Sequence, residues 1–148
     1  MPTDTDGNLP EPVLQLFDGS LRIGYMSTVR PDGYPFVVPV GIMIHEGKLR
    51  ISSRTATKKI WNLQRDARVS VCITDPENLD YFVAIRGTVE LADDTDRVFV
   101  DWLARTHMGS DEYPYEPRDV PRTIITIRPE RFVVRNRTGN QAGRTWTL

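Results

Sequence analysis

Alternation of apolar and polar side chains in short runs is the feature that most limits how this chain can fold. The runs Val69–Thr74 and Tyr81–Leu91 alternate residue by residue. A period of two predicts strands with one buried face. Short runs separated by turns fit the antiparallel strands of a small barrel better than a parallel sheet. The expected fold is therefore mainly β with helices (α+β), with six or seven antiparallel strands.

Turn residues divide the rest of the chain into further strands. Arg30–Gly33 has proline and glycine where a turn uses them, and Glu46-Gly47 predicts a tight hairpin. Pro39 cannot donate to a ladder, so a bulge or a sheet edge is expected there. Pro129 predicts a break between two late strands. The other expected strands are Arg22–Val29, Phe36–His45, Leu49–Ser53, Thr123–Ile127 and Phe132–Arg137.

Three helices are expected between these strands. Pro12 suits the first turn of a short helix that ends near Gly19, and a second helix is predicted over Thr57–Asp66. Asp93–Met108 reads as an amphipathic helix with acids at its start and an apolar inner face. The segment Gly109–Pro121 carries acids, prolines and tyrosines and is expected to be an exposed loop. The inner face of the third helix is expected to be Val98, Phe99, Trp102, Leu103 and Thr106.

Length and composition narrow the class of protein. The 148 residues suit one domain, expected over residues 11–148 after a flexible tail at 1–10. The net charge of −1 gives no field that attracts nucleic acid or an anionic membrane. No apolar run approaches the roughly 18 residues that span a bilayer, and the start has no signal-peptide core. A cytoplasmic protein that binds neither nucleic acid nor membrane is expected.

The chain lacks an evident catalytic acid, base or nucleophile. Its two histidines, His45 and His107, are far apart in sequence, so no metal site is expected and His107 is interpreted as a cation at a helix end. The lone Cys72 excludes an internal disulfide. The sequence therefore predicts no particular catalytic residue. Enzymes whose cofactor carries the reactivity need no such residues, because the protein supplies binding and orientation.

A cationic, hydroxyl-rich segment follows the third expected strand. It contains Arg54 and the adjacent Lys58 and Lys59, which are two of only three lysines in the chain. Helix N-termini and charged side chains together bind phosphate well. The alternative is an ordinary solvated, capped helix start, and spacing alone does not separate the two. The hydroxyl groups of this candidate phosphate site are Ser52, Ser53 and Thr57.

The order of these segments resembles a known family. Ile23–Val29, Pro31–Val40, Leu49–Ser53, Thr57–Leu63 and Asp66–Val71 are similar to the pyridoxamine-phosphate-oxidase-like, flavin-reductase-type split β-barrels. The branch that the chain most resembles contains actinobacterial oxidoreductases that use the deazaflavin coenzyme F420. The resemblance covers roughly residues 20–137. It implies a single cofactor-binding domain with a split barrel and a homodimer with two cofactor sites at the interface.

The resemblance also implies roles for residues. The element Thr57-Lys58-Lys59, with Ser52, Ser53 and Arg54 before it, would hold the cofactor phosphate, and Val38, Pro39 and Val40 would lie along the ring. Trp146 would either seal the barrel or stack on a bound ring. True pyridoxamine phosphate oxidases have Arg and Lys on the second strand, where this chain is apolar. That difference argues against vitamin B6 oxidation and favours F420 over FMN.

Two classes of function remain open. In the first, the chain is an F420-dependent oxidoreductase that transfers a hydride to an unsaturated or conjugated small molecule, with FMN as the alternative cofactor. In the second, the barrel binds a flavin, deazaflavin or heme without turnover. The substrate itself is not encoded in any recognisable motif.

Overall fold

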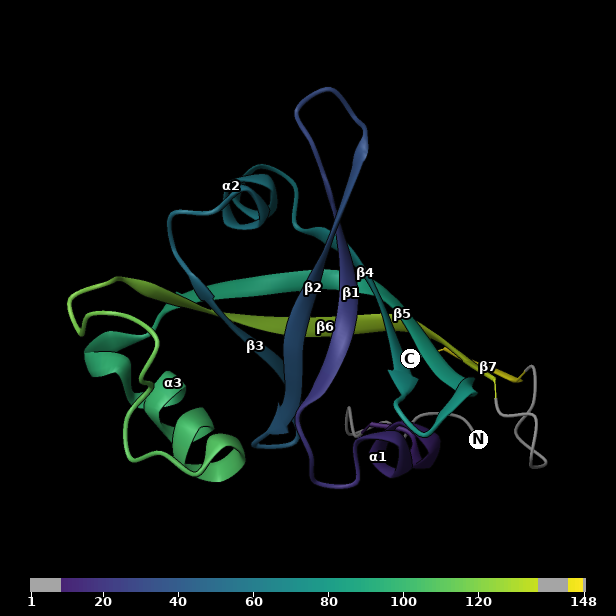
Figure 1. Cartoon of the computed structure of the whole chain (residues 1–148). Helices are drawn as coiled ribbons and strands as arrows, with labels where there is room; N and C mark the ends of the chain where they lie inside the picture. Colours follow the sequence, from purple (N-terminus) through teal and green to yellow (C-terminus); the bar gives the residue numbers. More distant parts are fainter. Residues whose placement is uncertain (1–8, 136–143, 148) are drawn as a thin grey trace.

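The computed structural model describes residues 9–135 and 144–147, the latter by backbone pairing only. Its order of elements places helices between groups of strands (Figure 1). The helices are α1 (Glu11–Phe17), α2 (Lys58–Arg65) and α3 (Val98–Leu103). The strands are β1 (Arg22–Val29), β2 (Pro35–His45), β3 (Lys48–Arg54), β4 (Arg68–Asp75), β5 (Asn78–Asp93), β6 (Arg122–Arg135) and β7 (Arg144–Thr147).

The strands form one antiparallel sheet that closes on itself. Their order is β3-β2-β1-β4-β5-β6-β7, and β3 also pairs with β6, so six strands form a ring and β7 extends it. The closure is incomplete between β2 and β3, which pair only from Met43 to His45. This is a split β-barrel, as the sequence predicted.

Alternation along the strands decides which side chains fill the barrel. In β1, Gly24, Met26 and Thr28 are buried, whereas Ile23 and Tyr25 are exposed on the outer face. Helix α1 supplies further core residues and lies at one end of the barrel (Figure 1). The largest fully buried side chains of the main core are Leu16, Phe17, Met26, Ile42, Leu49, Ile51, Ile60, Ile73, Ile85, Ile125 and Phe132.

The N-terminal part of β2 has only one neighbour. Residues 35–42 pair with β1, and Pro39 lies opposite Tyr25. No β-strand pairs with the other side of this stretch among the residues that the structure describes. The sequence expectation of an edge at Pro39 is therefore confirmed. The register past Pro39 is continuous, so the alternative of a bulge is not seen.

The two late strands that the sequence predicted are one strand. β6 runs through Pro129, and the interruption appears as a shift in register after Arg86 of β5. A glycine on the partner strand β5 allows this, because a Cβ on Gly87 would lie 2.1 Å from the Arg128 carbonyl oxygen. Glycine permits the close backbone approach that keeps β6 continuous past a residue without an N–H.

The predicted helix over residues 93–108 is shorter and broken. β5 continues to Asp93, a 3-10 turn follows at Thr95–Arg97 (η1), and a π-helical turn at Ala104–Met108 (η2) follows α3. Asp96 and Arg97 have φ angles of 57° and 59°, which a regular helix does not allow. Val98, predicted to face inward, is 65% exposed.

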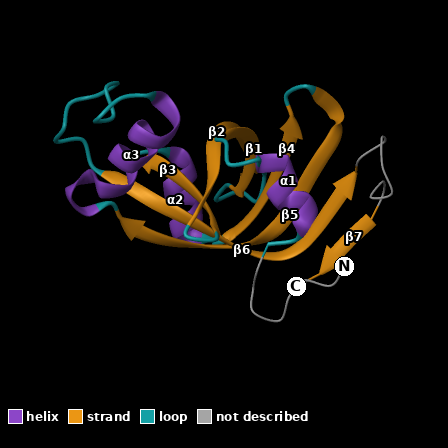
Figure 2. Cartoon of the chain, turned by 90° about the horizontal axis from the view of Figure 1, so that it is seen from below, coloured by secondary structure: helices purple, strands orange, loops and turns teal. Residues whose placement is uncertain are grey.

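Helices α2 and α3 lie on different parts of the barrel in Figure 1, although they overlap in projection in the view of Figure 2. Asn62 on α2 donates from Nδ2 to Thr28 Oγ1 of β1 at 3.0 Å, a buried polar contact that fixes the helix to the strand. Phe99 and Leu103 on α3 form a second apolar cluster with Met43. No helix among the described residues is long and apolar enough to cross a membrane.

Candidate phosphate and cofactor site

The end of β3, the turn after it and the start of α2 bring the predicted hydroxyl residues together. Ser53 is buried, its Oγ donates to the Arg54 carbonyl at 2.9 Å, and it lies 3.5 Å from Thr57 Oγ1. Thr57 precedes α2 but makes no side-chain cap. The first N–H groups of α2 have no side-chain acceptor and suit an anion.

Arg122, the first residue of β6, joins this cluster from a distant part of the chain. Its Nε donates to Ser52 Oγ at 3.0 Å. Lys59 is half-buried, and burial, followed by repulsion from the Arg122 guanidinium, lowers the pKa of its ammonium group. The two cations are thus close enough to influence each other. An anion between or beside them would relieve that repulsion.

Glu116 is the carboxylate at the centre of the cluster. Its side chain is 1% exposed and accepts from Arg54 Nε at 2.6 Å, Arg97 Nη2 at 2.9 Å and Arg122 Nη1 at 2.7 Å. Burial alone would raise its pKa, but hydrogen bonds from Arg122, Arg97 and Arg54 outweigh burial and lower the pKa to about 2. Glu116 lies in Gly109–Pro121, so the expectation that this whole segment is exposed was wrong for Glu116.

The charges of the cluster do not balance. Arg54, Arg97, Arg122 and Lys59 supply four cations, and Glu116 is the one carboxylate bonded to these arginines among the described residues. Arg97 Nε is also buried, with no hydrogen-bond partner in the part of the chain that the structure describes. Buried cations are costly unless they are paired. The surplus of positive charge fits an anionic group of the ligand, such as a phosphate.

The two adjacent lysines point to different places. Lys59 is near enough to Arg122 to be repelled by its charge, whereas Lys58 lines a cavity of about 230 Å³ between α2 and the β1–β2 hairpin. Phe36 of β2 lines the same cavity. The N-terminal part of β2, which pairs with a strand on one side only, therefore lies beside the start of α2. The other lining residues are Arg30, Pro31, Trp61, Asn62 and Arg65.

The residues predicted to contact the ring lie on the same N-terminal part of β2, where the strand has one open edge. Val38 is half-buried against the main core, Val40 is 7% exposed, and Pro39 is exposed on the outer face. Backbone N–H and C=O groups along an open strand edge can bond the polar edge of a ring. The arrangement therefore offers an apolar floor, an open hydrogen-bonding edge and a cationic end.

Trp146 is not brought to this cluster within one chain. It pairs with Phe132 on β6, whereas Thr123 of β6 pairs with Ser53. Nine residues of strand separate the two positions on β6, about 30 Å at a strand rise of roughly 3.3 Å per residue. The side chain of Trp146 and residues 136–143 and 148 lie outside the described part.

Sequence reasoning missed Arg97, Glu116 and Arg122. Each is more than 30 positions from the predicted phosphate residues, and only the β3–β6 pairing brings Arg122 next to Ser52. The surplus of arginine over lysine, 16 of 19 basic residues, was the one available signal. Arginine is favoured where several hydrogen bonds must be made in a buried ion pair.

The molecule is a split β-barrel with a cluster of cationic side chains at the end of β3. The sequence profile of the pyridoxamine 5'-phosphate oxidase family matches residues 11–136, and the chain belongs to this family. The chain is similar to a solved structure of a protein named F420 reductase, with 31% sequence identity and a TM-score of 0.71. The alignment covers 84% of this chain and 98% of the F420 reductase chain.

More distant solved structures share the fold. A nimC/nimA family protein from Clostridium acetobutylicum is 17% identical, with coverage of 92% of this chain and 91% of the other and a TM-score of 0.67. General Stress Protein 26 from Bacillus anthracis is 18% identical, with coverage of 93% and 97% and a TM-score of 0.66. No curated protein matches the sequence.

Proposed function

We propose that this protein is an F420-dependent oxidoreductase that transfers a hydride to an unsaturated or conjugated small-molecule acceptor. The observation that carries the proposal is the surplus of cations around Glu116. The open edge of β2 supports it, because Phe36 on that strand lines a cavity together with Lys58 at the start of α2. One end of the site suits a phosphate and the other a flat ring. The 31% identity to a protein named F420 reductase supports the same assignment.

In this proposal the phosphate lies at the start of α2. Lys59 and Arg122 supply charge, the open N–H groups of α2 supply hydrogen bonds, and the hydroxyls of Ser52, Ser53 and Thr57 line the approach. Arg54 is 56% exposed, so it can reach an anion while Glu116 orients it. Charge-assisted hydrogen bonds of this kind contribute roughly 1.5–3 kcal/mol each.

Val38–Val40 would hold the ring of the cofactor. When bound, reduced deazaflavin would supply the hydride for one carbon of a C=C or C=N bond of the acceptor, and the adjoining atom would take a proton. Tyr25 lies opposite Pro39 on the outer face, so its hydroxyl and solvent are the candidate proton sources. The apolar strand would exclude water from one side of the ring.

F420 is proposed over FMN because β2 carries no cation from Phe36 to Gly41. A cation on that strand would give a second charge to bind the phosphate of FMN, which is the end of that cofactor. FMN remains the alternative cofactor.

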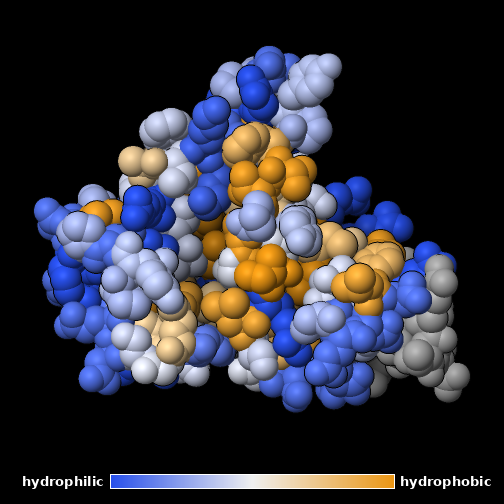
Figure 3. All heavy atoms as spheres, in the orientation of Figure 1, coloured by the Kyte–Doolittle hydropathy of each residue, from blue (hydrophilic) through white to orange (hydrophobic). Residues whose placement is uncertain are grey.

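A homodimer is part of the proposal. Apolar side chains lie on the outer face of the sheet, and Figure 3 shows apolar residues gathered over β1 and β2. Ile23, Tyr25 and Val37 are each more than half exposed there. Exposed apolar patches of this kind mark association surfaces. The partner subunit would cover the ring and complete the pocket.

Binding without turnover is the second candidate, and one observation favours it. Glu116 is the carboxylate in contact with the cationic cluster, and its pKa of about 2 keeps it ionised at neutral pH. It therefore cannot donate a proton there. If neither Tyr25 nor solvent delivers a proton to an acceptor, the site would hold a cofactor and do nothing more.

The test is a fluorescence titration of the purified protein with F420 and with FMN, followed by a turnover assay. Reduced F420 should be consumed in the presence of at least one member of a panel of enones, nitroarenes and imines. Tight binding with no consumption across the panel would favour the second candidate, and binding of FMN alone would reassign the cofactor.

A further inference from the structure

Trp102 on α3 contacts both histidines of the chain. The ring centroid of His45, at the end of β2, lies 4.3 Å from that of Trp102, and the ring centroid of His107 on η2 lies 5.6 Å from it. The sequence contains no other histidine. Imidazole is the side chain whose ordinary pKa lies closest to neutral pH. The two side chains that ordinarily change charge near neutral pH therefore lie against one tryptophan.

A hydrogen bond holds His45 in its neutral form. Its Nδ1 lies 2.7 Å from Nη1 of Arg50 on β3. A guanidinium can only donate, so Nδ1 accepts, and the ring proton of neutral His45 belongs on Nε2. Nε2 lies 4.0 Å from the Glu46 carboxylate. Protonation of Nδ1 would remove the bond from Arg50 and would leave two cations in contact.

The surroundings of both rings also favour the neutral form. Burial lowers the pKa of His45 from 6.5, and although the Glu46 carboxylate opposes this, the Arg50 guanidinium adds to it. Burial lowers the pKa of His107, whose Nε2 has no hydrogen-bond partner within the described residues. The face that α3 presents to the two histidines is aromatic and uncharged. A proton on either ring would therefore place a charge in a mainly apolar contact.

These contacts join α3 and η2 to the barrel. His45 belongs to a barrel strand and packs on Phe99 of α3 as well, with ring centroids 5.0 Å apart. Phe99 and Leu103 of α3 pack on Met43 of β2, and these three are the buried residues of this second apolar cluster. Elements with few buried apolar contacts open at lower free energy than the main core. Weaker histidine contacts would therefore loosen α3 before the barrel.

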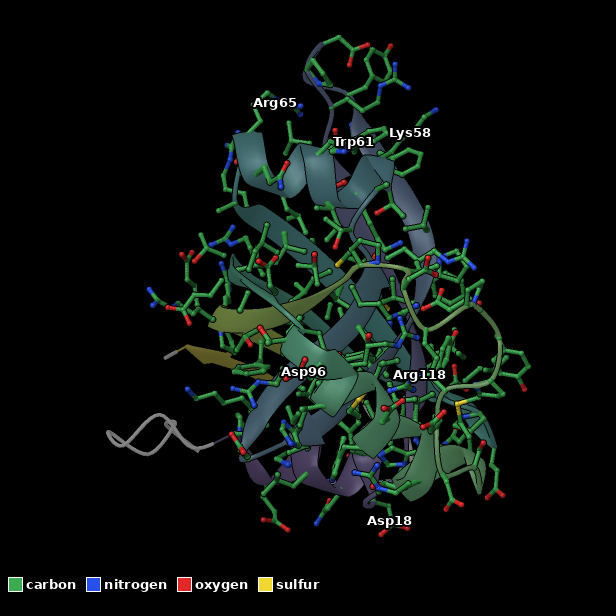
Figure 4. The ribbon with its side chains drawn as sticks, turned by 90° about the vertical axis from the view of Figure 1, so that its left-hand side faces the viewer. Asp18, Lys58, Trp61, Arg65, Asp96 and Arg118 are labelled. Carbon is green, nitrogen blue, oxygen red and sulfur yellow. The ribbon has the colours of Figure 1, made fainter. Side chains whose placement is uncertain are left out.

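Helix α3 in turn holds the segment that carries Glu116. The Asp101 carboxylate accepts from the Tyr113 N–H at 3.1 Å and from Nη1 and Nη2 of Arg118 at 3.0 and 2.9 Å. Figure 4 shows Arg118 beside α3 and well apart from α2. Glu116 lies between Tyr113 and Arg118 in the sequence and bonds Arg122. Displacement of α3 would therefore move a carboxylate that positions the cations of the candidate phosphate site.

We infer that His45, Trp102 and His107 form a pH-sensitive latch, which holds α3 and η2 against the barrel at neutral pH and loosens them in mild acid. Both histidines have a folded-state pKa below the ordinary value of 6.5, so the loosened state binds protons more readily. The stabilisation is therefore complete above pH 6.5 and is lost as the pH falls below it. The latch is independent of the proposed function, whereas its effect on cofactor affinity rests on that function.

Two measurements test the latch in the protein without cofactor. NMR titration of the imidazole signals of wild type should give a pKa below 6.5 for each histidine. Hydrogen exchange at about pH 7.5 and about pH 5.5, on either side of the histidine range, compares wild type with the double variant His45→Asn/His107→Phe. Asn Oδ1 can still accept from Arg50, and Phe keeps a ring on Trp102. His45→Gln/His107→Gln is the second variant if the first does not fold.

At the lower pH, the amides of residues 98–121 should exchange several-fold faster in wild type than in the double variant. At the higher pH the two proteins should agree. Comparison at one pH cancels the intrinsic pH dependence of exchange. Helix α2 lies on another part of the barrel and is the internal control, so it should exchange alike in both proteins. The melting temperature of wild type should fall by several degrees more than that of the variant between the two pH values.

Two results would overturn the latch. One is a pKa of 6.5 or above for both histidines, and the other is equal exchange of residues 98–121 in the two proteins at the lower pH. Fluorescence titration with F420 tests the effect on the site, and wild type should bind more weakly than the variant at the lower pH only. Equal affinities there would overturn the link through Glu116. Failure of both proteins to bind F420 at either pH would overturn the proposed function, but not the latch.

Discussion

Glu116 Oε1 lies 2.7 Å from Nη1 of Arg122, although the two residues belong to a loop and to the first position of a strand. The same arginine bonds Ser52 on β3 and lies over the Tyr113 ring at 4.8 Å from its centroid. The segment between η2 and β6 is therefore tied to the candidate phosphate site. Movement of this loop would alter the position of a phosphate-binding charge.

Lys59→Ala should weaken cofactor binding more than it weakens folding. The side chain is half-buried and close to Arg122, so its removal deletes one charge-assisted phosphate contact worth about 1.5–3 kcal/mol. The dissociation constant should rise by roughly one to two decades. Fluorescence titration measures this, with Lys48→Ala on the distant hairpin as the control. Unchanged affinity for both F420 and FMN would remove Lys59 from the site.

Glu116→Gln should change the acid limb of the stability curve. The folded pKa of about 2 lies below the ordinary value of 4.5, so Glu116 stabilises the fold above pH 4.5, and this contribution fades as the pH falls toward 2. A shift of that size corresponds to about 3 kcal/mol. Urea unfolding between pH 2 and 7 should show a shallower acid slope in Glu116→Gln. Glu112→Gln, at an exposed position, is the control.

Asp94→Ala should destabilise the protein by about 1–2 kcal/mol. The Asp94 carboxylate accepts hydrogen bonds from the N–H groups of Phe99 and Val100, both at 2.9 Å. These bonds stabilise the start of α3, which directly follows Asp96 and Arg97, the two residues with positive φ. Thermal unfolding should show the loss, whereas Asp93→Ala, at an exposed position, should change little. Equal effects of the two substitutions would mean that the cap contributes nothing.

The protein should be a dimer at micromolar concentration. Association would bury the apolar outer face of the sheet, and a lysine in place of Val37, which is 58% exposed, should oppose it. Light scattering should give twice the 16.9 kDa chain mass for wild type and less for Val37→Lys. A wild-type monomer at these concentrations would contradict both the dimer and a pocket shared between subunits.

Deletion of residues 144–148 should separate the two roles of Trp146. Trp146 pairs with Phe132, which is nine residues along β6 from the Thr123 that pairs with Ser53, so we expect a tail that contacts a cofactor to do so in the partner subunit of the proposed dimer. If the tail covers the cofactor, the truncated protein should bind F420 several-fold worse with little change in melting temperature. A lower melting temperature with unchanged affinity would instead make Trp146 part of the barrel only.

The histidines show where local sequence was a poor guide. His107 was interpreted as a cation at a helix end, yet it packs edge-on against Trp102 with ring centroids 5.6 Å apart. Burial lowers the pKa of His107, so the structure favours its neutral form. Whether a helix-terminal side chain is solvated depends on what the helix packs against, which the helix sequence does not contain.

Period-two alternation and turn chemistry determined the strands, because a half-buried strand imposes its pattern on its own residues. Glu46 and Gly47, for example, take φ angles of 52° and 73° in the predicted tight hairpin. The cationic segment around Lys58-Lys59 was likewise visible in the sequence. Only the tertiary structure decided that Glu116 and Arg122 complete that cluster, and that Lys58 lines the cavity beside the β1–β2 hairpin whereas Lys59 lies near Arg122. Barrel closure through the β3–β6 pairing joins residues about 70 positions apart, and no local pattern records such a contact.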